Sequence, residues 1–586
     1  MSPSGPVRDF ARFGEFEVSF PSRELRRNGL RIKLQDQPFQ VLEMLLERPN
    51  EIVTRAELQK KIWPADTFVD FDHGLNNAVK RLREALCDTA ETPRYIETLP
   101  RRGYRFLPHL NRTLDDRPNR AAPIDSIAVL PLANSSTDLD TECIAVGIPG
   151  NIIQRLSQIP GLRVISWASV SCDKNQDTDP QTIGRRFNVR ALLTGRIWVR
   201  SNQLRLHVDL VDTGSGEELW GEQYDRNVAE IFAVQDEIAR EVSQKLRLKL
   251  TGDQSARLRR HYTDNIEAYQ LFVRGRHSIE QRSLEGFKKG SEYLNGAIQR
   301  DSNYALAHAE LSQCLHMPAY YGVISPHEAY PKAKAMALRA LEMDDTLAEA
   351  HDTLATVMQN YQWDWRSAGK EYVRAIEFNP SYPIARLHYA MHLAFLGRFE
   401  EAIREAREGQ RRDPMSGVMN AALAFVLVLA GRYDWCIEQS LTTIDIDPAL
   451  TFTYISLAMA YARKGMFPEA ILANEKSLDL GGSAAFHKSA IGHAHALSGD
   501  QVAAREVLRE LQLKSEHSYV PLWSLAIVHD GLGEYDLAIK LLRQAVERRE
   551  AMLVSLKVWP LLEKSREDRR FPELERAVGL RGSADS

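Results

Sequence analysis

Apolar and polar side chains separate cleanly along the stretch from Asp72 to Leu86. The apolar positions follow the spacing i, i+4, i+7 and i+11 that places side chains on one face of an α-helix; they are Leu75, Val79, Leu82 and Leu86. The opposite face carries His73, Asn77, Lys80 and Arg81. Amide and cationic groups can donate hydrogen bonds to base edges and phosphates. The pattern therefore predicts a helix that presents nucleic-acid-binding groups on its polar face.

A second segment, YIETLPRRGYRF, follows this helix after a short polar link. It has strand character at both ends and places Arg101, Arg102 and Gly103 at its tip, which predicts a β-hairpin carrying two cations. A helix with a donor face followed by a basic hairpin describes a winged helix, in which the helix enters the major groove and the wing lies against the neighbouring backbone. An ordinary surface helix followed by a surface turn is the alternative.

The residues before this helix predict the remainder of a small domain. Residues 13–34 alternate apolar and polar positions around Asn28-Gly29, as in a small antiparallel sheet. A first helix has a buried face formed by Phe39, Leu42, Leu45 and Leu46. A second helix opens with Thr54 and Glu57, the spacing of a capping box. It ends at Trp63-Pro64, because proline cannot continue a helix.

Residues 13–107 resemble the DNA-binding domain of the OmpR/ToxR winged-helix family. The matching pieces are FGEFEVSF, RIKLQDQPFQVLEMLLERP, VTRAELQKKIW, LNNAVKRLREAL and YIETLPRRGYRFL. The resemblance implies a transcriptional regulator whose third helix reads double-stranded DNA and whose wing arginine enters the minor groove. It also implies that the loop 64–72 is where RNA polymerase or a neighbouring subunit touches the domain. Packing of the apolar residues of this loop under the domain is the alternative.

The third helix and the hairpin tip supply the expected DNA contacts. Asn77 and Arg81 lie one helical turn apart and suit bidentate contacts with adenine and guanine. Lys80 and His73 flank that face and are expected at phosphates. Arg101 and Arg102 are the candidates for the wing contact. The local pattern PRRG leaves open which arginine enters the groove.

After a polar linker at 111–123, residues 124–252 predict a central α/β domain. Buried strands are expected at 126–132 and 162–166 with a helix between them, followed by a hairpin around Ser201-Asn202, a third long strand and a helix. This segment resembles the TolB-amino-terminal-like module through IAVLPL, PGLRVIS, LLTGRIWV and FAVQDEIAREV. The resemblance implies a ligand or partner module without catalytic residues. The isolated glycines do not form a phosphate loop, because GKS and GKT are absent.

The remainder of the chain, 260–586, repeats with a fixed period. Glycines recur 34 residues apart at Gly397, Gly431, Gly465, Gly499 and Gly533. Small residues follow the same step at Ala390, Ala424, Ala458, Gly492 and Ala526. This period is typical of tetratricopeptide repeats, in which each helix pair buries its apolar face against a neighbour. Five repeats are clear at 383–550, one precedes them at 349–382, two earlier ones are degenerate, and 551–581 is expected to cap the stack.

Composition narrows the function without naming it. The chain has 586 residues and a net charge of −4, with +2 in residues 1–110 and −6 in the remainder. The net charge of the whole chain therefore does not indicate nucleic-acid binding, and the prediction of DNA binding depends on where the basic residues lie. Residues 73–105 hold seven Lys and Arg against four acids. The five cysteines show no CxxC spacing, which favours a reducing compartment and no zinc site. No apolar run reaches the ~18 residues that a membrane helix needs.

These patterns predict a multidomain α+β and all-α protein with an N-terminal winged helix (1–110), a central α/β domain and a tetratricopeptide α-solenoid. We expect a cytoplasmic bacterial transcription regulator, not an enzyme, without cofactor or metal. It would share the plan of HilA-type regulators and is compatible with a homodimer on DNA. The concave groove of the repeats is expected to bind a peptide or another protein segment. The alternative is a repeat scaffold whose winged domain binds protein.

Overall fold

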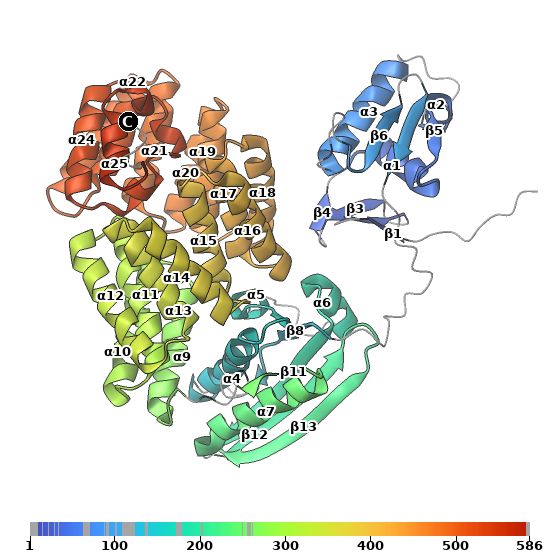
Figure 1. Ribbon diagram of the computed structural model, residues 1–586, viewed down its shortest axis with the longest axis vertical. Coiled ribbons are helices and arrows are strands. Elements are labelled where there is room, and N and C mark those ends of the chain that lie inside the picture. Colours follow the sequence, from blue (N-terminus) through green and yellow to red (C-terminus); the bar gives the residue numbers. More distant parts are fainter. Residues whose placement is uncertain are drawn as a thin grey trace, which may run out of the picture. The chain divides into compact units, whose positions relative to one another are not determined.

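The computed structural model describes residues 10–13, 16–20, 23–27, 30–32, 34–62, 71–86, 88, 93–99, 102–107, 124–134, 139–171, 179–200, 203–248, 250–252, 254, 260 and 262–581 (Figure 1). The chain divides into two compact units, 1–121 and 122–586. Each unit has a hydrophobic core of its own.

The described part of the first unit contains two small sheets and three helices. The leading sheet is an antiparallel meander of β1 (Phe10–Phe13), β2 (Phe16–Ser19), β3 (Glu24–Arg27) and β4 (Leu30–Ile32). The second sheet has the order β5-β7-β6, with β5 (Ile52–Thr54), β6 (Ile96–Leu99) and β7 (Gly103–Phe106). The helices are α1 (Asp36–Glu47), α2 (Arg55–Ile62) and α3 (Phe71–Leu86). This is the predicted winged helix.

Aromatic rings join the two sheets of the first unit. The Phe13 ring lies 4.8 Å from that of Phe106 and 5.6 Å from that of Tyr95, both in edge-on contacts. The faces of α1 and α3 that the sequence pattern predicted to be apolar are buried in the same core. The leading sheet is thus fastened to the wing.

The predicted capping box at the start of α2 is confirmed. The backbone N–H of Thr54 donates to Glu57 Oε2 at 2.8 Å, and the N–H of Glu57 donates to Thr54 Oγ1 at 3.3 Å. These bonds and the nearby Arg48 hold the pKa of the Glu57 carboxyl at about 2, below its ordinary value. The two side chains satisfy backbone donors that the first turn would otherwise leave open.

The second unit begins with an α/β domain that contains the predicted elements in the predicted order. Its strands are β8 (Ser126–Val129), β9 (Ala133–Asn134), β10 (Arg163–Val164), β11 (Ala191–Arg200), β12 (Gln203–Asp212) and β13 (Glu218–Asn227). Their order is β10-β8-β11-β12-β13, with β9 paired to β11. Strand β8 runs parallel to both of its neighbours, whereas β11, β12 and β13 are antiparallel. The helices are α4 (Leu139–Ser157), α5 (Trp167–Ser171), α6 (Pro180–Phe187) and α7 (Ile231–Lys245). The structure thus adds β9, α5 and α6, which the sequence pattern did not predict.

Eight helix pairs follow within the described residues. They are α9 (Ile266–Glu280) and α10 (Leu284–Arg300), α11 (Ala305–Tyr320) and α12 (Pro326–Met343), α13 (Ala348–Val357, continued by the π-helical turn Met358–Gln362) and α14 (Trp365–Phe378), α15 (Pro383–Phe395) and α16 (Phe399–Arg412), α17 (Gly417–Leu429) and α18 (Tyr433–Ile446), α19 (Thr451–Arg463) and α20 (Phe467–Asp479), α21 (Ala484–Leu497) and α22 (Gln501–Ser515), and α23 (Leu522–Gly531) and α24 (Tyr535–Glu547). The two degenerate repeats predicted near the linker are the first two pairs.

The glycines that revealed the period have a common conformation. Each follows the first helix of a pair and has φ between 71° and 93°, the left-handed region in which a side chain is strained. Ala390, Ala424 and Ala526, the small residues of the same repeats, are fully buried. Their size lets paired helices approach closely, as the repeat pattern predicted.

The α/β domain and the first repeats share one hydrophobic core that runs from Ile127 to Ala350. Helix α4 packs against α7 and also against α9 of the first pair. A second contact lies further along the array, where buried Asp413 accepts hydrogen bonds from Ser166 and Ser169 of the α/β domain, at 2.6 and 2.8 Å from their hydroxyls. Residues 122–586 therefore form one body.

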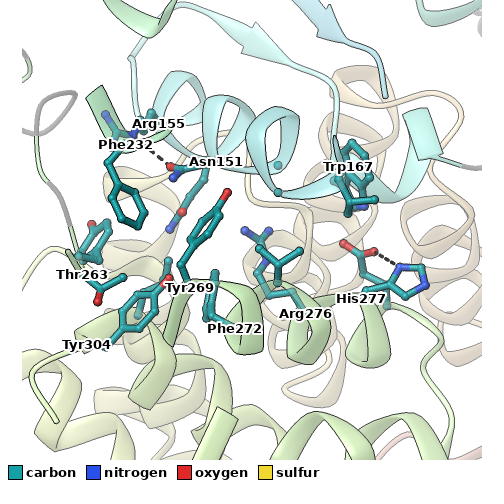
Figure 2. A pocket seen from close by; sticks show the side chains of 18 residues that line it. Asn151, Arg155, Trp167, Phe232, Thr263, Tyr269, Phe272, Arg276, His277 and Tyr304 are labelled. Atoms are coloured by element: carbon teal, nitrogen blue, oxygen red, sulfur yellow. Dashed lines mark hydrogen bonds and ion pairs between the residues drawn. The ribbon is translucent and has the colours of Figure 1, made fainter. Parts of the chain in front are cut away.

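A cavity lies where α4 crosses α9 (Figure 2). At Gly147 a Cβ atom would fall 2.5 Å from the Tyr269 hydroxyl, so glycine is needed for the close crossing. The charged groups around the cavity have partners, because Arg155 pairs with Asp236 and Arg276 lies 3.6 Å from Glu310. These interactions fasten the α/β domain to the first repeat.

The C-terminal segment 549–581 does more than cap the stack. Its helix α25 (Phe571–Ala577) packs on α24 as expected, with Arg543 2.7 Å from Glu573. Three short 3-10 turns precede it and cross earlier repeats: Ala551–Ser555, Pro560–Leu562 and Ser565–Glu567. Trp559 is fully buried, and its ring meets Phe425 of α17, Phe486 of α21 and Trp523 of α23. The segment thus covers part of the repeat surface that the sequence analysis expected to be available to a partner.

No helix among the described residues has the length and apolarity needed to cross a membrane.

Candidate nucleic-acid interface

Helix α3 presents the predicted polar face to solvent. Leu75, Val79 and Leu82 are buried beneath it at 2%, 2% and 0% exposure. Asn77, Lys80 and Arg81 are exposed, and the backbone of His73 lies in the first turn of the same helix. The side chain of His73 lies outside the described residues. The structure therefore brings Asn77, Lys80 and Arg81 onto one accessible surface.

A polar cluster fixes α3 against α2 and the wing. The Asn76 side-chain oxygen accepts hydrogen bonds from Arg55 Nη2 at 3.1 Å and from the Tyr104 hydroxyl at 3.2 Å. Arg55 also donates to the Tyr104 hydroxyl at 3.0 Å. Sequence reasoning did not single out these three residues, because they lie far apart in the chain and share no spacing.

Arg83 provides a second link between α3 and the wing. Its Nη2 donates to the Ile96 carbonyl at 2.9 Å and to Thr98 Oγ1 at 2.7 Å. Both acceptors belong to β6. With the Asn76 cluster, this contact holds the exposed face of α3 in a fixed orientation relative to the hairpin.

The wing itself is a regular two-stranded hairpin. Residues Ile96 to Leu99 pair with Gly103 to Phe106 in reverse order, and Arg102 N–H donates to the Leu99 carbonyl at 3.0 Å across the turn. Buried Asp88 fixes the start of β6, because its carboxylate accepts the backbone N–H groups of Arg94 and Ile96 at 2.6 and 2.7 Å.

Gly103 is needed where β7 approaches β5 closely. It is the first residue of β7 and pairs with Thr54 of β5. A Cβ atom at Gly103 would fall 2.1 Å from the Val53 carbonyl oxygen, so close approach of two strands excludes a side chain here.

The cations of the interface differ in how firmly they are held. Lys80 lies 4.0 Å from Glu84 on the same helix, and Arg81 donates to Gln35 Oε1 at the start of α1. Both contacts are exposed and are readily exchanged for contacts to a phosphate or a base. Arg102 is exposed and makes no ion pair with a described side chain, while Arg101 lies outside the described residues. The side chains of Lys80, Arg81 and Arg102 can therefore be offered to DNA without breaking the core.

The apolar loop before α3 is described only at its end. Phe71 begins α3 and packs, partly buried, against the core of the first unit. This contact supports packing for that residue. Residues 63–70 lie outside the described part, so the alternative of a polymerase or subunit contact at 64–72 stays open.

Comparisons with known families identify three segments. Residues 29–106 match the family "Transcriptional regulatory protein, C terminal". Residues 123–241 match the second domain of HilA/YgeH-like transcriptional regulators, which is the segment that resembled a TolB-amino-terminal-like module. Residues 383–408 match the tetratricopeptide repeat.

Individual relatives cover different shares of the chain. A putative adenylate cyclase 3 of Rhizobium meliloti is 33% identical over 235 residues, which is 40% of each protein. The transcriptional regulator HilA of Salmonella typhimurium is 23% identical over 399 residues, covering 67% of this chain and 68% of HilA. The solved RstA DNA-binding domain of Klebsiella pneumoniae, in complex with its RstA box, is 28% identical over 17% of this chain and all of that chain, with a TM-score of 0.16.

The family matches agree with the fold. The segment matched as a regulatory C-terminal domain contains α3 and the wing, and the HilA-like match covers the sheet of the second unit. The N-terminal domain is that of an OmpR/ToxR-type winged-helix transcriptional regulator, and the chain joins it to a HilA-like second domain and tetratricopeptide repeats.

Proposed function

We propose that this protein is a sequence-specific DNA-binding transcription regulator. The observation that carries the proposal is the exposed face of α3, where Asn77 and Arg81 lie one helical turn apart. Hydrogen bonds through Asn76 and Arg83 hold this helix against α2 and the wing. Asparagine and arginine can make bidentate contacts with adenine and guanine in the major groove. A rigid presentation reduces the conformational entropy lost on binding.

In this proposal the other cations position the domain on the backbone. Lys80 and His73 contact phosphates beside α3, and Arg101 or Arg102 of the wing enters the adjacent minor groove. Phosphate contacts fix register, whereas base contacts specify sequence. A homodimer on two half-sites would use each α3 in the same way.

The second unit receives a signal or holds a partner in this proposal. We keep the partition into a linker at 111–123, an α/β domain at 124–252 and a repeat array from 260 to 586. RNA polymerase or another protein would bind through 64–72 or through the part of the repeat surface that the C-terminal segment leaves open. We assign the chain no catalytic role and no cofactor, and we place its action in the cytoplasm, where the chromosome is accessible.

Salt dependence tests the proposal against the repeat scaffold. The full chain is titrated onto genomic DNA fragments at 50 and 200 mM salt. A protein that neutralises several phosphates loses about a hundredfold or more in affinity over this range. Arg26→Ala, an exposed cation in the leading sheet, is the matched control for Arg81→Ala. Binding that is absent, or unchanged by both salt and Arg81→Ala, would favour the scaffold.

A further inference from the structure

A groove lies between α14 and α15, the second helix of the third pair and the first helix of the fourth. The two helices pack against each other in the middle of the array (Figure 1). The groove has a volume of about 590 Å³, within the roughly 300–1,000 Å³ of ordinary ligand sites. It shares no lining residue with the cavity between α4 and α9. We call it the α14–α15 groove.

Much of the lining of this groove is apolar or aromatic. These side chains come from one face of α14 and one face of α15, and they include Trp365, Val373, Tyr389 and Leu396. The Tyr389 ring is stacked on the imidazole of His392, with centroids 6.2 Å apart. Val373 is 37% exposed, more than an isolated core residue would be. A ligand can therefore bury apolar surface here.

His392 offers an open acceptor to the groove. Its Nδ1 lies 2.8 Å from Gln359 Oε1, and Gln359 Nε2 donates to Asn360 Oδ1 at 2.9 Å. Nδ1 therefore carries the proton, and Nε2 is an acceptor without a hydrogen-bond partner among the described residues. Burial lowers the pKa of His392 to about 4, so the ring is neutral near pH 7. At Gly369 a Cβ atom would fall 3.0 Å from Nε2, so glycine leaves the approach to this nitrogen open.

Cations complete the lining, and no aspartate or glutamate lines the groove in the described part of the chain. The cations are Arg366, Lys370, Arg374 and Arg398. Two of them are already paired, since Arg374 lies 2.8 Å from Glu371 and Arg398 lies 2.7 Å from Glu401. The other two are the candidates for a charged ligand.

Arg366 and Lys370 lie one helical turn apart on α14. Both are exposed, and neither makes an ion pair within 4.0 Å with a described side chain. The nearby carboxylate is Asp364, which caps α14 by accepting the N–H of Ser367 at 3.1 Å. One carboxylate compensates only one of the two cations. A net positive charge on this turn favours an acidic ligand.

The C-terminal segment 549–581 fixes one end of the groove. The indole N–H of Trp365 donates to the Val578 carbonyl at 2.8 Å, and Lys557 Nζ donates to the Leu396 carbonyl at 3.4 Å. Lys557 is exposed and adds a cation at this end. No residue of this segment belongs to the lining in the part of the chain that the structure describes, so the groove stays open to a partner.

A protein segment fits this lining better than the DNA backbone does. Phosphate oxygens in a duplex carry no hydrogen for His392 Nε2, and charged oxygens gain nothing from apolar side chains. A tyrosine buries its ring against such side chains while its hydroxyl donates to an acceptor. Acidic residues on either side of that tyrosine complement the charge of Arg366 and Lys370.

We propose that the α14–α15 groove binds an acidic segment of a partner protein, with a tyrosine hydroxyl donating to His392 Nε2 and neighbouring carboxylates at Arg366 and Lys370. The regulatory meaning of this contact rests on the proposed function, in which the repeat array holds a partner. Binding itself requires neither DNA nor the winged helix.

Binding is measured by calorimetry on the purified full chain, without DNA, at 50 mM salt. The probes are three peptides with acetylated and amidated ends. Glu-Glu-Tyr-Glu-Glu is the acidic peptide, Gln-Gln-Tyr-Gln-Gln removes its charge, and Glu-Glu-Phe-Glu-Glu removes only the hydroxyl. Each peptide thus differs from the acidic one in a single property.

Two changes in the protein are matched to these probes. Arg366→Gln with Lys370→Gln removes the two cations, and Arg404→Gln with Arg407→Gln, exposed on α16 and outside the lining, is its control. Gly369→Ala places a methyl group over His392 Nε2, and Gly296→Ala, at a helical glycine of α10, is its control. Circular dichroism checks that each variant is folded, and each is also titrated with DNA.

We expect the acidic peptide to bind most tightly. Loss of charge from the peptide, or of the Arg366 and Lys370 cations, should each weaken binding about threefold to tenfold, as for two exposed ion pairs. The phenylalanine peptide should bind about fivefold more weakly than the tyrosine peptide, and Gly369→Ala should abolish that difference. The control variants should behave as the natural protein does.

Equal binding of the acidic and the neutral peptide, or no binding of any peptide at millimolar concentration, would overturn the inference. So would loss of DNA affinity on removal of the two cations with peptide binding unchanged, because the groove would then serve DNA. If a variant fails to fold, the comparison of the three peptides on the natural protein decides. Since peptide binding is measured without DNA, its failure leaves the proposed function standing.

Discussion

Replacing Trp559 with alanine should loosen the second unit and leave DNA binding intact. Trp559 is fully buried and joins the C-terminal segment to three repeats, with ring centroids 5.7 to 6.2 Å from Phe486, Trp523 and Phe425. Large-to-small changes at such sites destabilise by about 3–5 kcal/mol. The first unit has its own core and does not depend on these contacts.

The expected loss lies at the lower end of that range. The indole N–H of Trp559 is buried without a hydrogen-bond partner in the described part of the chain. An unsatisfied buried donor costs about 1–3 kcal/mol, and alanine removes that cost together with the ring. We therefore expect the free energy of unfolding of the second unit to fall by ~3 kcal/mol.

Two matched variants make the test specific. Trp559→Phe keeps an aromatic ring, removes the N–H and leaves a smaller cavity than alanine does, so its loss of stability should be clearly smaller than that of Trp559→Ala. Trp435→Ala removes a ring that is 44% exposed on α18 and should change stability by less than about 0.5 kcal/mol. Urea unfolding reports the stability, limited proteolysis reports release of 549–581, and a DNA-binding titration reports the first unit. Equal losses for Trp559→Ala and Trp435→Ala, or lost DNA binding in Trp559→Ala, would refute the reasoning.

Four further predictions concern the winged helix. Asn77→Ala or Arg81→Ala should cost ~1–3 kcal/mol on a cognate site and much less on random DNA, and equal losses on both would reassign the residue to a phosphate contact. Replacing Arg101 and Arg102 together with alanine should flatten the slope of log affinity against log salt by about one or two units, whereas an unchanged slope would mean that the wing is idle. The pKa of Glu57 in the folded protein is about 2, below the ordinary 4.5, so its capping bonds stabilise the first unit above pH 4.5 and lose this effect as the pH falls towards 2. The difference in stability between the natural protein and Glu57→Gln should therefore vanish between pH 4.5 and pH 2. A difference that stays constant over this range would contradict the cap. Residues 1–120 alone should bind DNA much as the full chain does and fail to regulate a promoter, while lost binding would indicate that the second unit supplies dimerisation.

Regular spacing made much of the fold predictable. The stripe from Leu75 to Leu86 and the buried face of α1 follow helical geometry, and both are buried as predicted. The glycines from Gly397 to Gly533 show the period because each turn needs a left-handed residue. A turn with a fixed local geometry requires the same type of residue in every repeat, and such a regular residue pattern can be recognised in a single sequence.

Contacts between distant residues left no comparable trace. Arg55, Asn76 and Tyr104 meet only after the chain has folded, and so do Asp413 and Ser166. The path of residues 549–581 across the repeats depends on the packing of Trp559 against aromatic rings of other helices. The 34-residue period of the sequence does not predict this packing. The outward face of α3 was predictable, whereas the clamp that orients it was not.

Genome-wide footprinting tests the central claim most directly. The natural protein and Asn77→Ala are each added to genomic DNA at 150 mM salt, and protected sites are sequenced. We predict one recurrent sequence under the sites of the natural protein, with protection lost in Asn77→Ala although its first unit remains folded. Protection spread without sequence preference, or the same sites protected by both proteins, would contradict base reading by α3.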